Sequence, residues 1–203
     1  MKLVIVDYGS GNLTSVSAAV RTLGVEPVVS GRPQDLADAD KIVLPGVGAF
    51  GDCMANLAAR GLVAPLAAVR DRIPILGICV GAQMMCRESD EFGHHLGLGW
   101  IDAVVRRIVP DDPTLRVPHV GWDDLHRVGA CPLFDGLADD DLFYYVHSYA
   151  IHAADPAVVA GECDYGGRFV AAFRSGAVYG VQFHPEKSQK AGLAVLGNFV
   201  ARG

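Results

Sequence analysis

The stretch ILGICVGAQMM, residues 75–85, joins an apolar run to a cysteine that stands between two glycines. A short apolar run without polar interruption is typical of a strand that is buried on both faces of a sheet. The residues that follow, 80–87, predict a helix. A buried strand that turns at glycines directly into a helix is the unit from which open α/β folds are built, and it places Cys79 at the carboxyl end of that strand.

The same alternation of strand and helix runs through the first half of the chain. Short apolar runs predict four strands, at residues 2–7, 26–30, 41–45 and 73–78. Helical spacing of apolar residues predicts three helices, at 13–23 with a stop at Gly24, at 57–69 with a break or kink at Pro65, and at 80–87. This alternation predicts a largely parallel sheet with helices against its faces.

Beyond residue 100 the pattern changes. Segments rich in aromatic and β-branched residues, separated by Gly, Asp and Pro, predict strands at residues 100–109, 142–150, 168–174 and 177–184. Residues 189–202 predict a last helix. We therefore expect an α/β protein with one domain over residues 1–203. Its sheet would be open, mostly parallel and flanked by helices, with additional antiparallel strands in the C-terminal half.

Composition and charge exclude several classes of function. The formal net charge is −6 and no stretch clusters Lys and Arg, so we expect no nucleic-acid partner. No apolar stretch approaches the roughly 20 residues of a membrane span, and the first residues form no signal core, so we expect neither a membrane association nor a secretory leader. The five cysteines are scattered without a C-x-x-C pair, which predicts a cytoplasmic protein without a metal site.

A glycine-containing turn at residues 9–14, GSGNLT, is similar to half of a dinucleotide-binding fingerprint. Thr14 stands where the third glycine would be, and the strand at 26–30 offers no acidic residue at the end where a ribose would need it. We interpret the segment as a tight turn in which Asn12 or Thr14 helps to cap the following helix. We therefore expect no cofactor.

Gly77, Cys79 and Gly81 have the spacing of a nucleophile elbow. In such a turn the strained backbone pushes the central side chain outward, while flanking glycines avoid clashes between neighbouring turns. The N-terminus of the helix that begins at Val80 favours a thiolate and offers an N–H donor to an oxyanion. A buried structural cysteine in a site of close glycine packing explains the motif about equally well, so the elbow alone leaves both interpretations open.

His184, Pro185 and Glu186 end a β-like run near the C-terminus. Residues i and i+2 of an extended segment project to the same side, so Glu186 can orient the far nitrogen of the imidazole while the near nitrogen faces Cys79. Taken separately, a His-Pro-Glu turn is more often a surface loop. Paired with an elbow cysteine, it predicts a catalytic triad.

The glycine-rich turn LPGVGAFGD, residues 44–52, follows another predicted strand. Glycines let a backbone approach a bound group closely and present N–H groups to it. We expect the turn at Val47 and Gly48 to supply a second oxyanion donor, beside the Val80 amide. An ordinary loop between a strand and a helix is also compatible with this motif.

Six blocks of sequence occur together and in a characteristic order. They are DYGSGN (7–12), PGVGAFGD (45–52), GICVGAQ (77–83), VPHVGW (117–122), YYVHSY (144–149) and GVQFHPEKS (180–188). This set resembles the triad-type, class I glutamine amidotransferases, and within them the glutaminase subunits of imidazole glycerol phosphate synthases. The resemblance covers residues 3 to about 200 and implies a flavodoxin-like α/β fold.

By this resemblance, Cys79 attacks the side-chain amide carbon of glutamine and His184 protonates the departing ammonia. The thioester is then hydrolysed to glutamate, with Glu186 as the third member of the triad. The residues that the resemblance implies for substrate binding are Gln83, Glu91, His147, Ser148 and Tyr149. A carboxylate suits the ammonium group of a zwitterionic substrate, and backbone N–H groups suit its carboxylate.

The resemblance also implies a heterodimer with a cyclase subunit that has a (β/α)8 barrel. That partner uses the ammonia to convert a phosphoribulosyl formimino carboxamide nucleotide into imidazole glycerol phosphate and aminoimidazole carboxamide ribotide, in histidine biosynthesis. Asn12, Trp122 and Lys187 are candidates for the interface. Two positions depart from the family pattern, since Ala82 and Asp123 stand where Met and Asn are usual, and residues 86–91 are more polar than usual.

Three other functions fit the sequence less well. A glutaminase of pyridoxal phosphate synthesis typically has Glu-Ser after its glycine loop, where this chain reads GVGAF. A regulatory or scaffold relative without catalysis usually lacks Cys79, His184 or Glu186, and all three are present. An α/β esterase has its acidic residue before the histidine, whereas Glu186 follows His184.

Overall fold

Five parallel strands form the centre of the molecule, which the computed structural model describes over residues 1–203. They are β1 (Leu3–Val6), β2 (Val28–Ser30), β3 (Lys41–Gly46), β4 (Ile75–Cys79) and β14 (Val178–Val181), in the spatial order β2-β1-β3-β4-β14. Every residue of β1, β3, β4 and β14 is buried, as expected for strands that are covered on both faces. The predicted parallel sheet is confirmed, and its strand order is flavodoxin-like.

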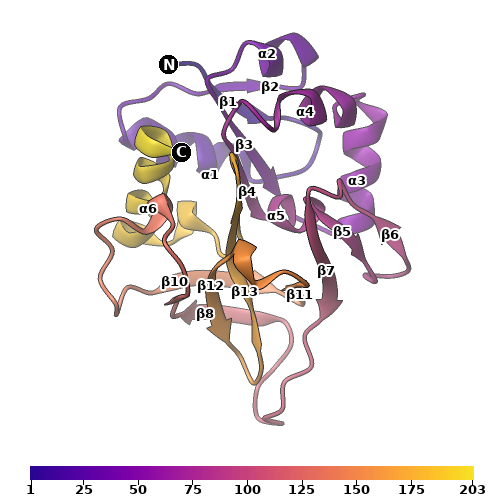
Figure 1. Ribbon diagram of the computed structural model, residues 1–203, viewed down its shortest axis with the longest axis vertical. Coiled ribbons are helices and arrows are strands. Elements are labelled where there is room, and N and C mark those ends of the chain that lie inside the picture. The colour runs from indigo at the N-terminus through magenta and orange to yellow at the C-terminus, as the bar shows by residue number, and fades with distance from the viewer.

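Helices cover both faces of this sheet (Figure 1). The helices on one side are α1 (Leu13–Thr22) and α6 (Gln189–Arg202), and those on the other are α3 (Phe50–Ala59) and α4 (Val63–Val69). Two short helices, α2 (Pro33–Ala37) and α5 (Val80–Met84), follow β2 and β4. None of the helices has the combination of length and apolar character that crossing a membrane requires.

Strands from residue 86 onward extend the sheet beyond β14. The next strands in space are β13 (Arg168–Ser175), β11 (Tyr149–Ala153), β7 (Ile101–Arg107), β5 (Cys86–Ser89) and β6 (His95–Leu96). β12 (Val159–Asp164) pairs with β13 and with β9 (His126–Arg127). The predicted antiparallel addition is confirmed, except that β14 runs parallel to β4 and β5 runs parallel to β7.

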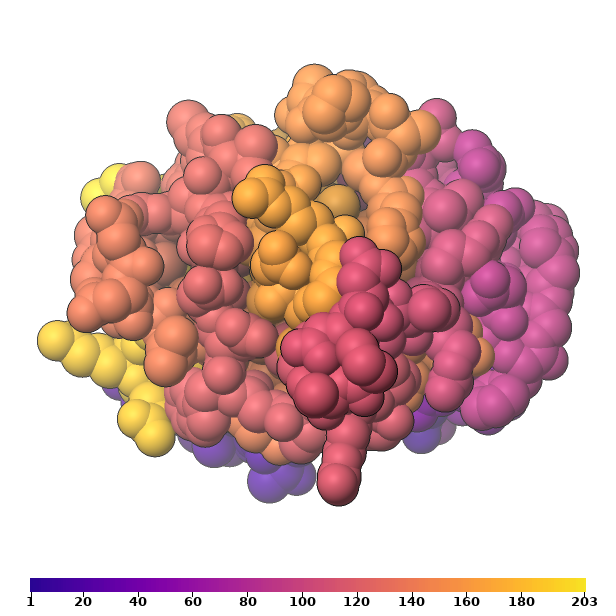
Figure 2. Space-filling model, turned by 90° about the horizontal axis from the view of Figure 1, so that it is seen from below, coloured from indigo at the N-terminus to yellow at the C-terminus, as the bar shows by residue number.

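A separate antiparallel ribbon pairs β8 (His119–Asp123) with β10 (Phe143–His147) in the lower part of the molecule (Figure 1). Seen from below, the surface is formed largely by the second half of the chain, red to orange in Figure 2. Short 3₁₀ turns lie at η1 (Pro132–Phe134), η2 (Pro156–Val158) and η3 (Pro185–Lys187). One cluster of 57 buried hydrophobic residues runs through both halves, so the parallel and antiparallel parts share a single core.

The helix predicted at residues 57–69 is in fact two helices. α3 begins earlier, at Phe50, and ends at Ala59, and the chain then turns through Gly61 with a φ of 68° before α4 begins. The break predicted at Pro65 is wrong. Pro65 lies in the first turn of α4, where backbone N–H groups have no partner within the helix, so its missing N–H is tolerated.

The helix predicted at residues 80–87 ends at Met84, and residues 86–89 form β5 instead. The carbonyl oxygens of the last helical residues accept hydrogen bonds from the loop at residues 98–101, for example at 2.7 Å from the Leu98 N–H to the Met84 carbonyl. Tertiary pairing therefore ends this helix, and no local sequence pattern marks its end.

The strand predicted at residues 142–150 breaks at Ser148 into β10 and β11, which belong to different sheets. No Gly or Pro marks this break. The patterns also do not predict the partly polar or very short elements β5, β6, β8, β9, β12 and α2. The break at Ser148 matters for the site, because it exposes backbone groups that a continuous strand would pair.

Candidate active site

Cys79 is the last residue of β4 and has a backbone conformation that residues other than glycine rarely adopt, with φ 54° and ψ −115°. α5 begins at the next residue, Val80. Packing holds this strained turn, since Cys79 is only 4% exposed and all five residues of α5 are buried. Residues 77–81 therefore have the backbone of a nucleophile elbow.

Close packing requires the glycines on both sides of Cys79. A Cβ at Gly77 would lie 2.7 Å from the backbone of Ala82, and a Cβ at Gly81 would collide with the carbonyl oxygen of Leu44 in β3. β4 and α5 can therefore pass beside β3 only if both positions lack a side chain. Close glycine packing and a strained cysteine are thus two features of one elbow.

His184 lies just before η3, next to the end of β14, the strand that pairs with β4. Its Nδ1 lies 2.8 Å from Oε1 of Glu186, and both side chains are buried. The backbone N–H of His184 donates to the carbonyl of Tyr144 at 2.9 Å, and the Ser188 hydroxyl donates to the His184 carbonyl at 2.6 Å. These bonds fix the histidine turn against β10.

The pKa of His184 results from opposing influences. Burial alone would lower it, but hydrogen bonds and charges from Cys79 and Glu186 outweigh burial and raise the pKa to about 9. The imidazole therefore carries two protons at neutral pH. In that state it can pair with a thiolate and hold a proton for a leaving group.

Glu186 has a second partner from the other end of the chain. Its Oε1 also accepts from Nδ2 of Asn12 at 3.3 Å, while its Oε2 is buried without a hydrogen bond. The predicted tight turn is present, with φ values of 89° at Gly9 and 120° at Gly11. The expected cap by Asn12 or Thr14 is wrong, because no side chain caps α1 and the Asn12 amide turns toward Glu186 instead.

The turn at Val47 and Gly48 follows β3 and forms part of the same cavity wall as Cys79. The thiol of Cys53 donates to the carbonyl oxygen of Val47 at 3.5 Å. Because the C=O and N–H of a trans peptide point in opposite directions, the Gly48 N–H points away from Cys53. Neither this N–H nor that of Val47 donates a hydrogen bond within the protein, so the turn leaves backbone donors unpaired beside the cavity.

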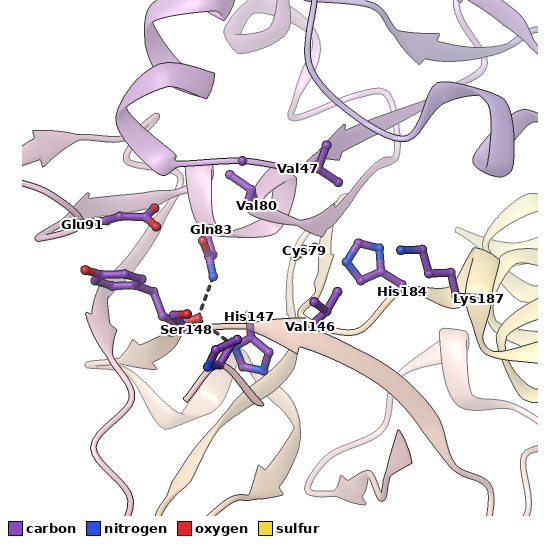
Figure 3. Close-up of a pocket in the computed structure, with 13 residues that line it drawn as sticks. Val47, Cys79, Val80, Gln83, Glu91, Val146, His147, Ser148, His184 and Lys187 are labelled. Atoms are coloured by element: carbon purple, nitrogen blue, oxygen red, sulfur yellow. Dashed lines mark hydrogen bonds between the residues drawn. The ribbon is translucent and has the colours of Figure 1, made fainter. Parts of the chain in front are cut away.

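The residues predicted for the reaction, together with the interface candidate Lys187, meet at one cavity of about 400 Å³ at the carboxyl ends of β3 and β4 (Figure 3). Those that line it are Val47, Gly48, Cys79, Val80, Gln83, Glu91, His147, Ser148, Tyr149, His184 and Lys187. Glu186 lies behind His184, and Asn12 and Trp122 are also outside the wall. The carboxyl end of a parallel sheet is where open α/β folds bind ligands, so this is the candidate active site.

Gln83 connects α5 to the opposite wall of the cavity. Its Nε2 donates to the carbonyl of Tyr149 at 2.9 Å and to Oε1 of Gln182 at 3.0 Å, and both glutamines are buried. Gln182 in turn directs its Nε2 at the sulfur of Cys79, 3.7 Å away. Gln182 is not among the residues predicted for the site, although its position two residues before His184 is a signal that the two side chains face the same region.

Glu91 is the carboxylate of the cavity wall. Its Oε2 accepts from the backbone N–H of Phe50 at 2.6 Å, at the start of α3. Burial raises the pKa of Glu91 above the usual range, and the Phe50 N–H opposes this rise in part. A cation beside Glu91 would favour its charged form, so the position suits an ammonium group.

The backbone at Ser148 and Tyr149 is the second polar feature of the wall. The Ser148 carbonyl accepts from the Ile108 N–H at 2.9 Å, and the Tyr149 carbonyl accepts from Gln83 and from Nδ1 of His147 at 2.8 Å. Both carbonyl groups are therefore held by the protein. The N–H of Ser148 donates no hydrogen bond within the protein, so it is available to an anionic group.

Trp122 and Lys187 meet at Tyr144, beside the cavity. The Trp122 ring packs edge-on against Tyr144 with centroids 5.9 Å apart, and Nζ of Lys187 lies 5.6 Å from the centroid of the same tyrosine. Trp122 is 44% exposed and Val120, on the same strand, is 54% exposed. β8 therefore presents apolar surface near the cavity, while an interface role for Asn12, Trp122 and Lys187 stays a prediction.

Three side chains outside the cavity, Asp123, Asp124 and Cys163, bring potential metal ligands within 4.8 Å of one another. Burial raises the pKa of the Cys163 thiol, and the neighbouring carboxylates raise it further. Asp123 and Asp124 lie at the end of β8 and are partly exposed, whereas Cys163 of β12 is fully buried. The expected lack of a metal site stays a prediction.

Known proteins were found that resemble this chain over nearly all of its length. The profile of the family described as Glutamine amidotransferase class-I matches residues 4–202. A protein of Syntrophotalea carbinolica named Imidazole glycerol phosphate synthase subunit HisH is 46% identical over 202 residues, which cover 97% of this chain and 98% of that protein. A protein of the same name from Geobacter sulfurreducens is 45% identical over 204 residues, covering 98% and 97%.

The fold has solved counterparts as well. A solved structure described as PurLQS from Thermotoga maritima superposes with a TM-score of 0.76, and the match covers 98% of this chain and 97% of that chain. The sequence identity is 20%, so this similarity concerns the fold alone.

Proposed function

Because this chain belongs to the class I glutamine amidotransferases, we propose that it is the glutaminase subunit of an imidazole glycerol phosphate synthase, active in histidine biosynthesis. The observation that carries the proposal is the cavity that brings together the strained Cys79, the His184–Glu186 pair and the free N–H of Gly48. A nucleophile, a proton donor and an oxyanion donor are what hydrolysis of an amide requires.

The reaction begins when the thiolate of Cys79 attacks the amide carbon of the glutamine side chain. The carbonyl electrons move onto the oxygen, and the N–H groups of Gly48 and Val80 stabilise the oxyanion. When the C–N bond breaks, His184 gives its proton to the departing nitrogen, and ammonia leaves a thioester. His184 then takes a proton from water as that water attacks the thioester, which yields glutamate and regenerates the thiolate, while Glu186 stabilises the imidazolium.

The two charged ends of glutamine have separate partners in this proposal. Glu91 receives the α-ammonium group, and its raised pKa returns toward the usual range when the cation binds. The free N–H of Ser148 receives the α-carboxylate, with the backbone of His147 and Tyr149 completing the wall. Gln83 holds this wall through the Tyr149 carbonyl and contributes its remaining oxygen to the substrate.

The partner is a cyclase subunit, since the relatives that match this chain over their whole length are themselves named as subunits of a synthase. Ammonia is protonated in water at neutral pH and then loses its nucleophilicity, so direct delivery to the cyclase is required. The cyclase uses it to form imidazole glycerol phosphate and aminoimidazole carboxamide ribotide. The apolar surface at Trp122 and Val120, with Asn12 and Lys187, docks the barrel of the cyclase. All five cysteines are free thiols, which suits the reducing cytoplasm.

Glutamate release should depend strongly on the complete synthase. We expect the purified chain to turn over glutamine slowly. Addition of the cyclase with its nucleotide should raise the rate by roughly 10²-fold, the effect expected if the partner moves the Gly48 N–H from near the cavity into its exact position for the oxyanion. Glutamate is measured with the chain alone, with the cyclase, and with both cyclase and nucleotide. Equal rates in the three mixtures would contradict coupling to the partner, and absence of glutamate in all of them would contradict the glutaminase.

The alkaline side of the pH profile should report the His184 proton. Its pKa is raised to about 9, so the imidazolium required for ammonia release is present below that pH and is lost as the pH rises through it. We expect kcat/KM of the complex to fall above about pH 9. In Glu186→Gln one of the groups that raise this pKa is neutral, so the fall should begin at lower pH. An unshifted alkaline limb in that variant would contradict the orienting role of Glu186.

A further inference from the structure

His119 lies buried between two tyrosine rings and has a polar partner at each ring nitrogen. Its ring stacks on Tyr145 and Tyr165 with centroid distances of 4.9 and 3.9 Å, and the residue is 2% exposed. Nδ1 of His119 lies 3.2 Å from Nε2 of His147, and Nε2 of His119 lies 3.3 Å from Oδ2 of Asp123. The proposed catalytic steps use none of these contacts.

The protons in this chain of contacts can be assigned by donor and acceptor chemistry. The Tyr149 carbonyl can only accept, so Nδ1 of His147 carries the proton in their 2.8 Å bond. Burial lowers the pKa of His147 to about 3, so its ring is neutral and its Nε2 accepts. Nδ1 of His119 must therefore donate to it. Nε2 of His119 then faces the carboxylate of Asp123, which can only accept. A hydrogen bond between these two atoms therefore requires a second proton, either on the imidazole or on the carboxylate.

One end of this chain is the backbone that is proposed to receive the carboxylate of glutamine. His147 holds the Tyr149 carbonyl together with Gln83, and the adjacent Ser148 N–H remains free at the cavity. The other end, Asp123, is 30% exposed on β8, the strand that carries the exposed Trp122. A continuous series of contacts therefore runs from the surface of β8 to the wall of the cavity.

We propose that His119 and His147 are positioning residues that hold the Ser148–Tyr149 backbone for the α-carboxylate of glutamine, and that a proton between His119 and Asp123 keeps this support in place. The inference rests on the proposed glutaminase function and deepens it. Neither histidine is a catalytic residue, since both act on the substrate through the backbone. The α-carboxylate does not change during the reaction, so losing this support raises KM and leaves kcat nearly unchanged.

The sign of the pH effect follows from the groups that face His119. They are Asp123 on its own strand, His147 and Tyr145 on β10, and Tyr165 in the turn after β12, with Phe169 of β13 as an apolar edge. Burial lowers the pKa of His119 below its usual range, although Asp123 opposes this. Burial also raises the pKa of Tyr145, which therefore stays neutral. Rising pH thus removes the proton, and a lone pair then faces the carboxylate.

Asp123→Asn provides the sharpest test, because an amide donates to the neutral Nε2 of His119 without the extra proton. In the complex with the cyclase, we expect the wild-type KM for glutamine to rise roughly tenfold between about pH 5 and pH 8, the effect of one lost hydrogen bond. The KM of Asp123→Asn should stay low across this range, with kcat within about twofold of wild type. Titration of glutamine itself, or of His184, affects both proteins equally and cancels in the comparison.

The matched control is Asp124→Asn, which removes the neighbouring charge that contacts His126 instead of His119 and should follow the wild-type profile. A KM in Asp123→Asn that varies with pH as in wild type would overturn the inference. Glutaminase activity missing from the wild-type complex would instead overturn the proposed function. His119→Asn places an amide nitrogen near the position of Nδ1 and should keep KM low, whereas His119→Leu should raise it at every pH.

A second measurement does not depend on turnover. Imidazole ¹⁵N spectra should show His147 as the neutral tautomer with its proton on Nδ1, and His119 with two protons at low pH and one at high pH. In Asp123→Asn, His119 should be neutral, with its proton on Nδ1, over the whole range. A proton on Nε2 of His147 would contradict the assignment, even if a histidine variant failed to fold.

Discussion

Cys79→Ala is expected to abolish glutamine hydrolysis and to leave synthesis from free ammonia intact. The sulfur of Cys79 is the only protein atom in the proposed mechanism that bonds to the substrate carbon, so its loss should lower glutaminase kcat by about 10⁴-fold or more, as removal of a catalytic nucleophile does. The cyclase reaction itself needs only ammonia. The measurement pairs glutamate release with the rate of imidazole glycerol phosphate formation from an ammonium salt, both in the complex.

The suitable control is Cys131→Ala, since Cys131 is buried before η1 and does not line the cavity. It should lose a small amount of stability and keep its glutaminase activity. Copurification of the cyclase with Cys79→Ala checks that the fold and the interface survive. Persistent glutamine hydrolysis by the alanine variant would refute Cys79 as the nucleophile.

Gly81→Ala should have the largest effect on stability. The added methyl would collide with the Leu44 carbonyl of the neighbouring strand, and both partners are held in the sheet and the buried helix, so neither can move aside. We expect a loss of about 3 kcal/mol, the upper end for overpacking, or roughly 10 °C in Tm for a domain of this size. Any folded fraction should also have a displaced elbow and reduced kcat.

Gly197→Ala is the matched control for this substitution. Gly197 lies inside α6, and the nearest atom to an added Cβ is a flexible Leu23 methyl 3.6 Å away. Alanine is the better helix former by about 1 kcal/mol, so this variant should be as stable as wild type or slightly more stable. Thermal and urea unfolding of both variants measure their stability relative to wild type. If Gly81→Ala unfolded like wild type, the elbow would not be as tightly packed as the structure indicates.

The strands and helices that could be predicted are those whose burial shows in the order of their own apolar residues. The strand before Cys79 is an uninterrupted apolar run, and the helix at residues 13–23 has apolar residues at helical spacing, because both are buried in or against the sheet. The end of α5 at Met84 could not be predicted, because it depends on hydrogen bonds from the loop at 98–101. The break at Ser148 likewise depends on pairing with Ile108, some forty residues earlier in the chain.

In the candidate site too, short-range relations could be predicted and long-range contacts could not. Cys79, His184 and Glu186 are identifiable because the elbow and the i, i+2 spacing are short-range relations, and they lie at one cavity or directly behind it. The partners that orient them come from distant segments. Asn12 reaches Glu186 across nearly the whole chain, and the contact of His119 with His147 follows from the pairing of β8 with β10. No spacing within a single segment encodes such contacts.

The position of β14 has a consequence for how the protein is made. β14 is inserted between β4 and β13, although it is synthesised about a hundred residues after β4. A chain still emerging from the ribosome therefore contains the elbow cysteine long before it contains the strand beside it or the histidine proposed as its partner. The sheet around the elbow and the proposed Cys79–His184 pair can be completed only when translation is nearly finished.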